Sequence, residues 1–103
     1  MATLTRLEPD APPLRTANLN WLESLAAALR ARGLQADVLA LPARMPWLEV
    51  TNPATGCAGD VYAWRGQDGS WWYWWPWAER IAASDDLPLA AERIEAGLSP
   101  VPV

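Results

Sequence analysis

Few side chains of this sequence could do chemistry, and they are scattered. The chain has no His, and its one Cys, Cys57, lies in a loop-forming stretch without a nearby base. A thiol nucleophile needs a base, and zinc sites and Ser-His-Asp triads need His or clustered Cys, so none of these is expected within one chain. Glu49 and the neighbours Asp85 and Asp86 could act as a glycosidase-type carboxylate pair. Asp86 is explained more simply as a helix cap, so we predict a non-enzymatic protein with no catalytic residue, cofactor or metal.

A run of aromatic residues from Ser70 to Trp77 is the remaining candidate for function. Five of the eight tryptophans of the chain fall within these eight residues, with Tyr73 among them. Aromatic side chains favour strands, in which successive side chains point to opposite faces. Both faces of this strand are therefore aromatic. One face can form the core, and the other needs a cover, which would be another part of the chain, a second subunit or a ligand.

Two helices and four strands are predicted to position this run. Apolar residues at three- and four-residue spacing predict a helix over residues 17–32, which Gly33 ends in a left-handed conformation. A second helix is predicted over residues 87–96, capped by the Ser84-Asp85-Asp86 stretch. Alternation and composition predict strands over residues 35–41, 47–51, 60–65 and 70–77, with an extension through residues 78–81.

The turn between the last two strands decides which aromatic residues share a face. Asp68-Gly69 suits a tight two-residue turn, because both residue types tolerate positive φ. That turn would place Trp64 opposite Tyr73 and Ala63 opposite Trp74. The predicted core face then holds Leu48, Val50, Val61, Ala63, Trp72 and Trp74. The predicted open face, which is the candidate binding site, holds Trp47, Glu49, Tyr62, Trp64, Trp71, Tyr73 and Trp75, with Thr51 beside them.

Composition restricts the class of partner and the setting. The net charge is −4, and the positive charges are eight scattered Arg with no Lys, which argues against nucleic acid and against anionic membranes. A single Cys favours a reducing cytoplasm, and no apolar run approaches the ~20 residues of a membrane span. The length fits one domain over residues 16–98. A disordered or draped N-terminal tail is expected over residues 1–15 and a short C-terminal tail over residues 99–103.

Two segments also carry a resemblance. LEVTNP and GSWWYWWPWAERIA resemble small single-domain actinobacterial proteins with a W-W-x-W-W-x-W-A/G-E-R-I run before a C-terminal helix. The absence of Lys and the abundance of Ala and Arg suit a high-GC genome. The resemblance covers residues 18–98. It implies an architecture and a cytoplasmic setting, and it supplies no catalytic residue.

These observations predict an α+β fold with a four-stranded antiparallel sheet and both helices on one face, in the order α-β-β-β-β-α. The predicted function is non-catalytic binding through the open aromatic face in a regulatory or accessory role. The partner would be a protein, either another protein or a second copy in a homodimer. Two alternatives remain. The aromatic residues could form a pocket for a small flat, cationic or sugar-like ligand, or they could all be core, with the function elsewhere.

Overall fold

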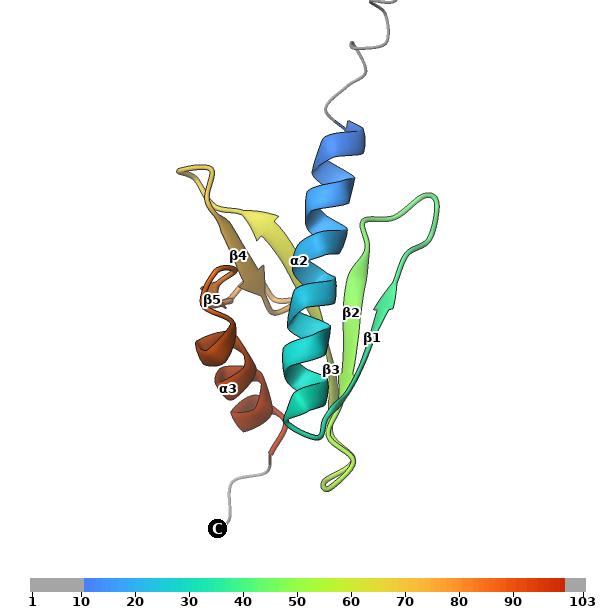
Figure 1. Cartoon of the computed structure of the whole chain (residues 1–103), viewed down its shortest axis with the longest axis vertical. Helices are drawn as coiled ribbons and strands as arrows, with labels where there is room; N and C mark the ends of the chain where they lie inside the picture. Colours follow the sequence, from blue (N-terminus) through green and yellow to red (C-terminus); the bar gives the residue numbers. More distant parts are fainter. Residues whose placement is uncertain (1–10, 100–103) are drawn as a thin grey trace, which may run out of the picture.

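The structure, a computed structural model, describes residues 11–99 and has two helices packed on one face of a five-stranded antiparallel sheet (Figure 1). The α+β class is confirmed, but the predicted number of four strands is wrong. The predicted tails over residues 1–10 and 100–103 lie outside the described residues. The strands follow one another across the sheet in sequence order. The elements are α2 (Ala11–Ala31), β1 (Gln35–Leu39), β2 (Trp47–Thr51), β3 (Ala58–Arg65), β4 (Trp71–Trp74), β5 (Arg80–Ala83) and α3 (Leu87–Gly97).

Helix α2 supplies one side of the core. It begins at Ala11 rather than at residue 17, so the tail expected to reach residue 15 overlaps its first turns. The apolar stripe is fully buried, at Leu22, Leu25, Ala26 and Leu29. The helix ends as predicted, because Gly33 has φ +89° and the N–H groups of Gly33 and Leu34 bond back to the last turn. None of the helices in the described part has both the length and the apolar character that crossing a bilayer requires.

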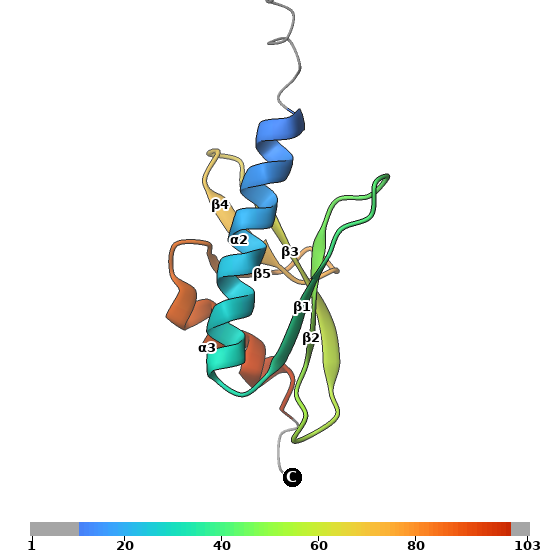
Figure 2. The same ribbon diagram turned by 45° about the vertical axis from the view of Figure 1, so that its right-hand side comes forward.

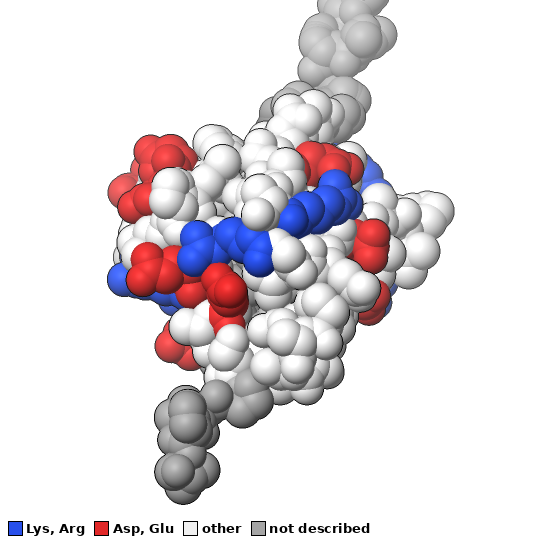
Figure 3. All heavy atoms as spheres, turned by 60° about the horizontal axis from the view of Figure 1, so that its bottom comes forward, with Lys and Arg blue, Asp and Glu red and all other residues white. Residues whose placement is uncertain are grey.

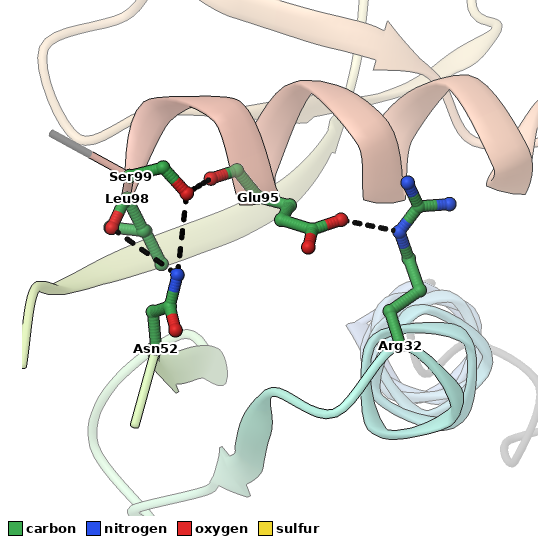
Figure 4. A network of polar contacts seen from close by, with 5 residues as sticks. All are labelled: Arg32, Asn52, Glu95, Leu98 and Ser99. Atoms are coloured by element: carbon green, nitrogen blue, oxygen red, sulfur yellow. Dashed lines mark hydrogen bonds and ion pairs between the residues drawn. The ribbon is translucent and has the colours of Figure 1, made fainter. Parts of the chain in front are cut away.

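Helix α3 is fixed at both ends. The side chain of Asp86 caps it by accepting a hydrogen bond from the N–H of Leu89 at 3.3 Å, as the sequence predicted. Beyond its C-terminus, Asn52 from the β2–β3 loop bonds to Ser99 at 3.3 Å (Figure 4). Between the helices, Arg32 pairs with Glu95 at 2.8 Å (Figure 4). These contacts hold α3 against the sheet and beside α2 (Figures 1 and 2).

The β3–β4 turn has three residues in its loop, not two. The N–H of Gly66 bonds to the carbonyl of Ser70 at 2.7 Å, and the N–H of Gly69 bonds to the carbonyl of Gly66 at 3.1 Å. Gly69 has φ +86°, so it is the left-handed residue that closes a three-residue loop. Asp68 stiffens the loop by accepting bonds from the hydroxyl and N–H of Ser70, and these bonds lower the pKa of its carboxyl. Because the loop is one residue longer than predicted, the strands pair one residue out of the expected register.

That shift reverses the two faces of β4. Ala63 lies opposite Tyr73 and Trp64 lies opposite Trp72, rather than opposite Trp74 and Tyr73. A one-residue change of register moves every side chain of a strand to the other face. Tyr73 is therefore fully buried beneath the helices. The predictions that Trp72 and Trp74 face the core, and that Trp71, Tyr73 and Trp75 face outward, are wrong.

The fifth strand arises from a second turn of the same kind. The aromatic run from Ser70 to Trp77 forms a strand, β4, only as far as Trp74. The chain then reverses at Pro76, and residues 80–83 pair with β4 as a further strand, β5. The N–H of Trp75 bonds to the carbonyl of Glu79 at 2.8 Å, and the N–H of Ala78 bonds to the carbonyl of Trp75 at 3.0 Å. Ala78 has φ 66°, the position that Gly69 occupies in the first turn. The sequence prediction missed this reversal because Ala gives no turn signal there.

Ala78 gives a direct test of this turn. A left-handed backbone costs a residue with a Cβ atom roughly 1 kcal/mol or more relative to Gly. We therefore expect Ala78→Gly to raise the free energy of unfolding by about 0.5–1 kcal/mol, measured by urea denaturation. Gly69→Ala should lower it by a similar amount. A destabilised Ala78→Gly variant would contradict the positive φ at this position.

Strand β3 pairs with a different neighbour in each half. Residues 58–61 pair with β2 and residues 62–65 pair with β4, so β2 and β4 diverge on either side of α2 (Figure 1). Continuing the β2 register would place Pro46 opposite Ala63, and Pro46 has no N–H to donate. The carbonyl of Ala63 instead accepts a bond of 2.5 Å from Nδ2 of Asn18 on α2. Asn18 thus replaces the β2 partner at the point where the sheet divides.

Candidate interaction surface

We call the sheet face away from the helices the open face. Asp37, Glu49 and Tyr62 belong to it because their strand neighbours Ala36, Leu48 and Val61 are buried beneath the helices. Of the seven predicted site residues, the register places four on this face: Trp47, Glu49, Tyr62 and Trp64. The register adds two that the sequence prediction assigned to the core: Trp72 and Trp74.

Of the other three predicted site residues, Trp71 and Tyr73 lie on the helix side, whereas Trp75 packs against the core and also lines the open groove described below. Trp71 and Tyr73 pack against the core, and the indole of Trp71 also meets the indole of Trp64 edge to face at 5.9 Å. The ring of Trp75 covers the end of α3, because a Cβ atom at Gly97 would lie only 3.0 Å from Cζ2 of that ring. Trp77 stacks on Trp75 from outside, at 5.3 Å between ring centroids, and remains 65 % exposed.

Arginine side chains lie over four of the tryptophans on the open side. The guanidinium of Arg80 is 4.4 Å from the ring centroid of Trp72 and 5.4 Å from that of Trp74. Two further contacts are of the same type, Arg44 over Trp47 at 4.0 Å and Arg65 over Trp64 at 5.5 Å. A guanidinium above an indole face is attracted by the ring quadrupole. We call these seven residues the arginine–tryptophan cluster.

The arginines of this cluster differ from the other four in the described part of the chain. Arg15, Arg30 and Arg93 donate to backbone carbonyls, and Arg32 pairs with Glu95. By contrast, the guanidinium groups of Arg44, Arg65 and Arg80 have no hydrogen bond or ion pair within residues 11–99. Within the described part of the chain, their N–H donors are therefore unused.

Three carboxylates form a line across the other half of the open face. Asp37 on β1 lies opposite Glu49 on β2, and Glu49 lies opposite Asp60 on β3. We call these three residues the acid row. Like charges directly opposite one another in a sheet are destabilising. The described residues form no ion pair with any of them. The acid row therefore carries a repulsion that no ion pair within residues 11–99 relieves.

An open groove runs between the dividing halves of the sheet. Its volume is about 520 Å³, and its lining is apolar and aromatic apart from Arg65: Met45, Tyr62, Trp64, Arg65, Trp74, Trp75, Pro76 and Ala78. A smaller pocket of about 260 Å³ shares Met45 and Trp64 with it and reaches Asn18. Asn18 is 1 % exposed, and its Oδ1 has no hydrogen-bond partner among the described residues. Glu49, the acid expected beside a cationic ligand, does not line either space.

The described residues contain no cluster of His, Cys, Asp and Glu suited to a metal ion. Cys57 is a half-buried free thiol in the β2–β3 loop. Comparisons with protein-family models, with curated proteins and with solved structures found no match to the chain. The resemblance to the actinobacterial proteins therefore stays a prediction, and the function must be argued from this surface.

Sequence reasoning missed two features of this surface. Trp72 and Trp74 could have been placed by considering the three-residue loop, which fits Asp68-Gly69 equally well. Arg80 enters the surface only because β5 returns beside β4. The signal for that return was Pro76, a residue favoured at the first central position of a turn.

Proposed function

We propose that this protein is a non-catalytic interaction module, and that it binds another protein surface through the open face. One observation carries the proposal. Three arginines that have no polar partner within residues 11–99 lie over tryptophans of the sheet, whose open face both helices leave uncovered. Tryptophan, tyrosine and arginine dominate the binding energy of protein interfaces, and large apolar patches on a surface commonly mark such sites. A regulatory or accessory role in a reducing cytoplasm fits a chain with one free Cys.

The proposal predicts that association depends on the position of a tryptophan rather than on its exposure. Trp74 is half-buried on the open face, whereas Trp77 is 65 % exposed in the turn beyond it. We expect Trp74→Ala to weaken association by about 30-fold or more, because hot-spot residues contribute about 2 kcal/mol or more. The matched control, Trp77→Ala, should change it by less than about threefold. Sedimentation velocity of the purified chain measures self-association, and calorimetry measures binding to a purified partner.

Folding must be followed in the same samples. Both variants should keep the circular dichroism spectrum of the wild type and a cooperative thermal transition. If Trp74→Ala stays folded and association is unchanged, the open face is not the binding surface. If Trp77→Ala has the larger effect, the binding surface lies around the β4–β5 turn.

A small ligand in the groove is the second candidate. The volume of about 520 Å³ and the aromatic lining favour it. The one charged lining residue is Arg65, so such a ligand would be flat and anionic rather than cationic. Quenching of tryptophan fluorescence by aromatic carboxylates tests this candidate, and Trp64→Ala should abolish the quenching.

A further inference from the structure

The acid row and Arg80 lie at opposite sides of the open face, although the carboxylate of Asp68 is close enough to Arg80 to interact with it electrostatically. The acid row lies on β1, β2 and β3, while Arg65 and Arg80 lie on β3 and β5. At the lower end of the molecule, by contrast, arginines and acidic residues lie side by side (Figure 3). There Arg32 pairs with Glu95, the one ion pair within residues 11–99. The three carboxylates of the acid row and the guanidinium groups of Arg44, Arg65 and Arg80 therefore have no ion-pair partner within residues 11–99.

We propose that the partner is a second copy of this chain. The two copies dock face to face, so that the acid row of each lies against the arginine–tryptophan cluster of the other; this rests on the proposed function of the open face. Trp47 and Tyr62 lie between the acid row and Arg80: Trp47 is two residues from Glu49 on β2, and Tyr62 pairs with Trp74, which pairs with Arg80. A two-fold axis in the plane between the faces, running along these two residues, brings the acid row of each copy over Trp72, Trp74 and Arg80 of the other. Arg44, which lies over Trp47, then lies close to the axis. Each contact then occurs twice, as in any isologous dimer.

Charge balance favours a second copy over a different kind of partner. An acidic surface would be repelled by Asp37, Glu49 and Asp60, and a basic surface would be repelled by the three arginines. A copy of the same face meets both groups with the opposite sign. The net charge of −4 makes two copies repel one another at long range, so the local pairing also sets their relative orientation.

The geometry of the arginines suits this contact. A guanidinium stacked on an indole keeps the N–H groups at its edge free for a carboxylate. Arg80 is held in this way above Trp72 and Trp74, with no polar partner in the described residues. The carboxylates of the other copy would receive these donors, and the like-charge repulsion within the acid row would be relieved. The partly exposed rings of Trp64, Trp72 and Trp74 supply the apolar area that the dimer buries, whereas Trp47 is already buried.

A charge-exchange experiment tests the arrangement. Sedimentation equilibrium of the full chain, up to about 1 mM so that even a weak dimer is seen, gives the dimer dissociation constant. We expect Glu49→Arg and Arg80→Glu each to weaken the homodimer ~100-fold, because symmetry places two like-charge contacts in each dimer. An equimolar mixture of the two variants should form a heterodimer. The double variant E49R/R80E should restore the homodimer to within ~10-fold of the wild type. Glu92→Arg, on the exposed side of α3, makes the same charge change away from the face and is the control.

The outcomes separate this proposal from the proposed function. A wild-type chain that stays monomeric at about 1 mM overturns the dimer and leaves the open face for a different protein. A dimer unaffected by Trp74→Ala uses another surface, which overturns the face-to-face dimer and again leaves the open face for a different protein. A dimer that needs Trp74 but tolerates both charge reversals, or is not restored by mixing or by the double variant, overturns the pairing of acid row with cluster. Thermal melting of each charge variant within a few degrees of the wild type, and a cooperative transition for Trp74→Ala, show that loss of the dimer is not loss of the fold.

Discussion

Replacing Tyr73 by Ala should lower the free energy of unfolding by about 3–5 kcal/mol, the range measured when large buried aromatic residues are truncated. Tyr73 is the largest fully buried side chain of the described residues. It lies opposite Ala63 on β3 and Ala82 on β5, beneath both helices. The two alanines opposite Tyr73 are too small to fill the space that its ring leaves, so the variant has a cavity at the centre of the sheet. Chemical denaturation followed by circular dichroism measures the loss.

Trp74→Ala is the matched control for this prediction. Trp74 is the next residue of the same strand but lies half-buried on the open face, so we expect a loss of about 1–2 kcal/mol. The reverse order of the two losses would mean that β4 pairs in the register first predicted from the sequence. The experiment therefore tests the three-residue β3–β4 loop as well as the core.

The hydroxyl of Tyr73 adds a pH dependence. It donates to the carbonyl of Trp21 at 2.7 Å, and burial raises the pKa of this phenol. A group whose pKa is raised by folding contributes its full stabilisation of the folded state at pH values below its unfolded pKa, which is near 10 for tyrosine. That stabilisation is lost as the pH rises above the unfolded pKa. Tyr73→Phe should cost about 1 kcal/mol at neutral pH and should remove this alkaline loss.

Asn18→Asp should have the second large effect, and one that depends on pH. Nδ2 of Asn18 donates to the carbonyl of Ala63, in a site only 1 % exposed. The introduced carboxylate has no proton to donate and would face a carbonyl oxygen out of water. Burial of this kind raises the pKa of a carboxyl by several units, at 1.36 kcal/mol per unit. We therefore expect a loss of about 4–5 kcal/mol near pH 7.5.

The direction in which the stability of the Asn18→Asp variant changes with pH shows whether the introduced charge causes the loss. Because folding raises the pKa of the introduced carboxyl, the variant should be most stable below its unfolded pKa, near 4, and should lose stability as the pH rises. When protonated, the carboxyl can donate to Ala63 and replace the amide. Asn18→Ala removes the hydrogen bond without adding a charge, so it should cost about 1–3 kcal/mol at every pH. A loss for Asn18→Asp that does not vary with pH would argue against the contact with Ala63.

The sequence predicts those parts of the fold that depend on local patterns. The apolar stripe of α2, the Gly33 terminator and the Asp86 cap all lie where their residue types indicate. Each depends on neighbours within one or two turns of helix. The faces of β2 were also predicted, because Leu48 and Val50 alternate with polar or amphipathic residues.

The aromatic strand could not be placed in this way, because it has no polar side. Trp71, Trp72, Tyr73 and Trp74 offer either face to a core, so one turn decides between two registers. Asp68-Gly69 satisfies both a two-residue turn and the end of a three-residue loop. Which loop forms depends on packing beneath the helices, where Tyr73 bonds to Trp21, more than fifty residues earlier. The arginine–tryptophan cluster was missed for the same reason, since it exists only in the observed register.

The change of partner along β3 has a consequence for how the molecule opens. One strand alone joins the β1–β2 hairpin to the β4–β5 hairpin, with residues 58–61 serving the first and residues 62–65 the second. Either hairpin can detach without breaking the ladder of the other, so the sheet should behave as two cooperative units joined by a shared strand. Amide hydrogen exchange should then show two tiers of protection that meet between Val61 and Tyr62. The hydrogen bond from Asn18 to the carbonyl of Ala63 lies close to that boundary. Its loss should therefore lower the exchange protection of amides in the β3–β4 pair before that of amides in the β1–β2 pair.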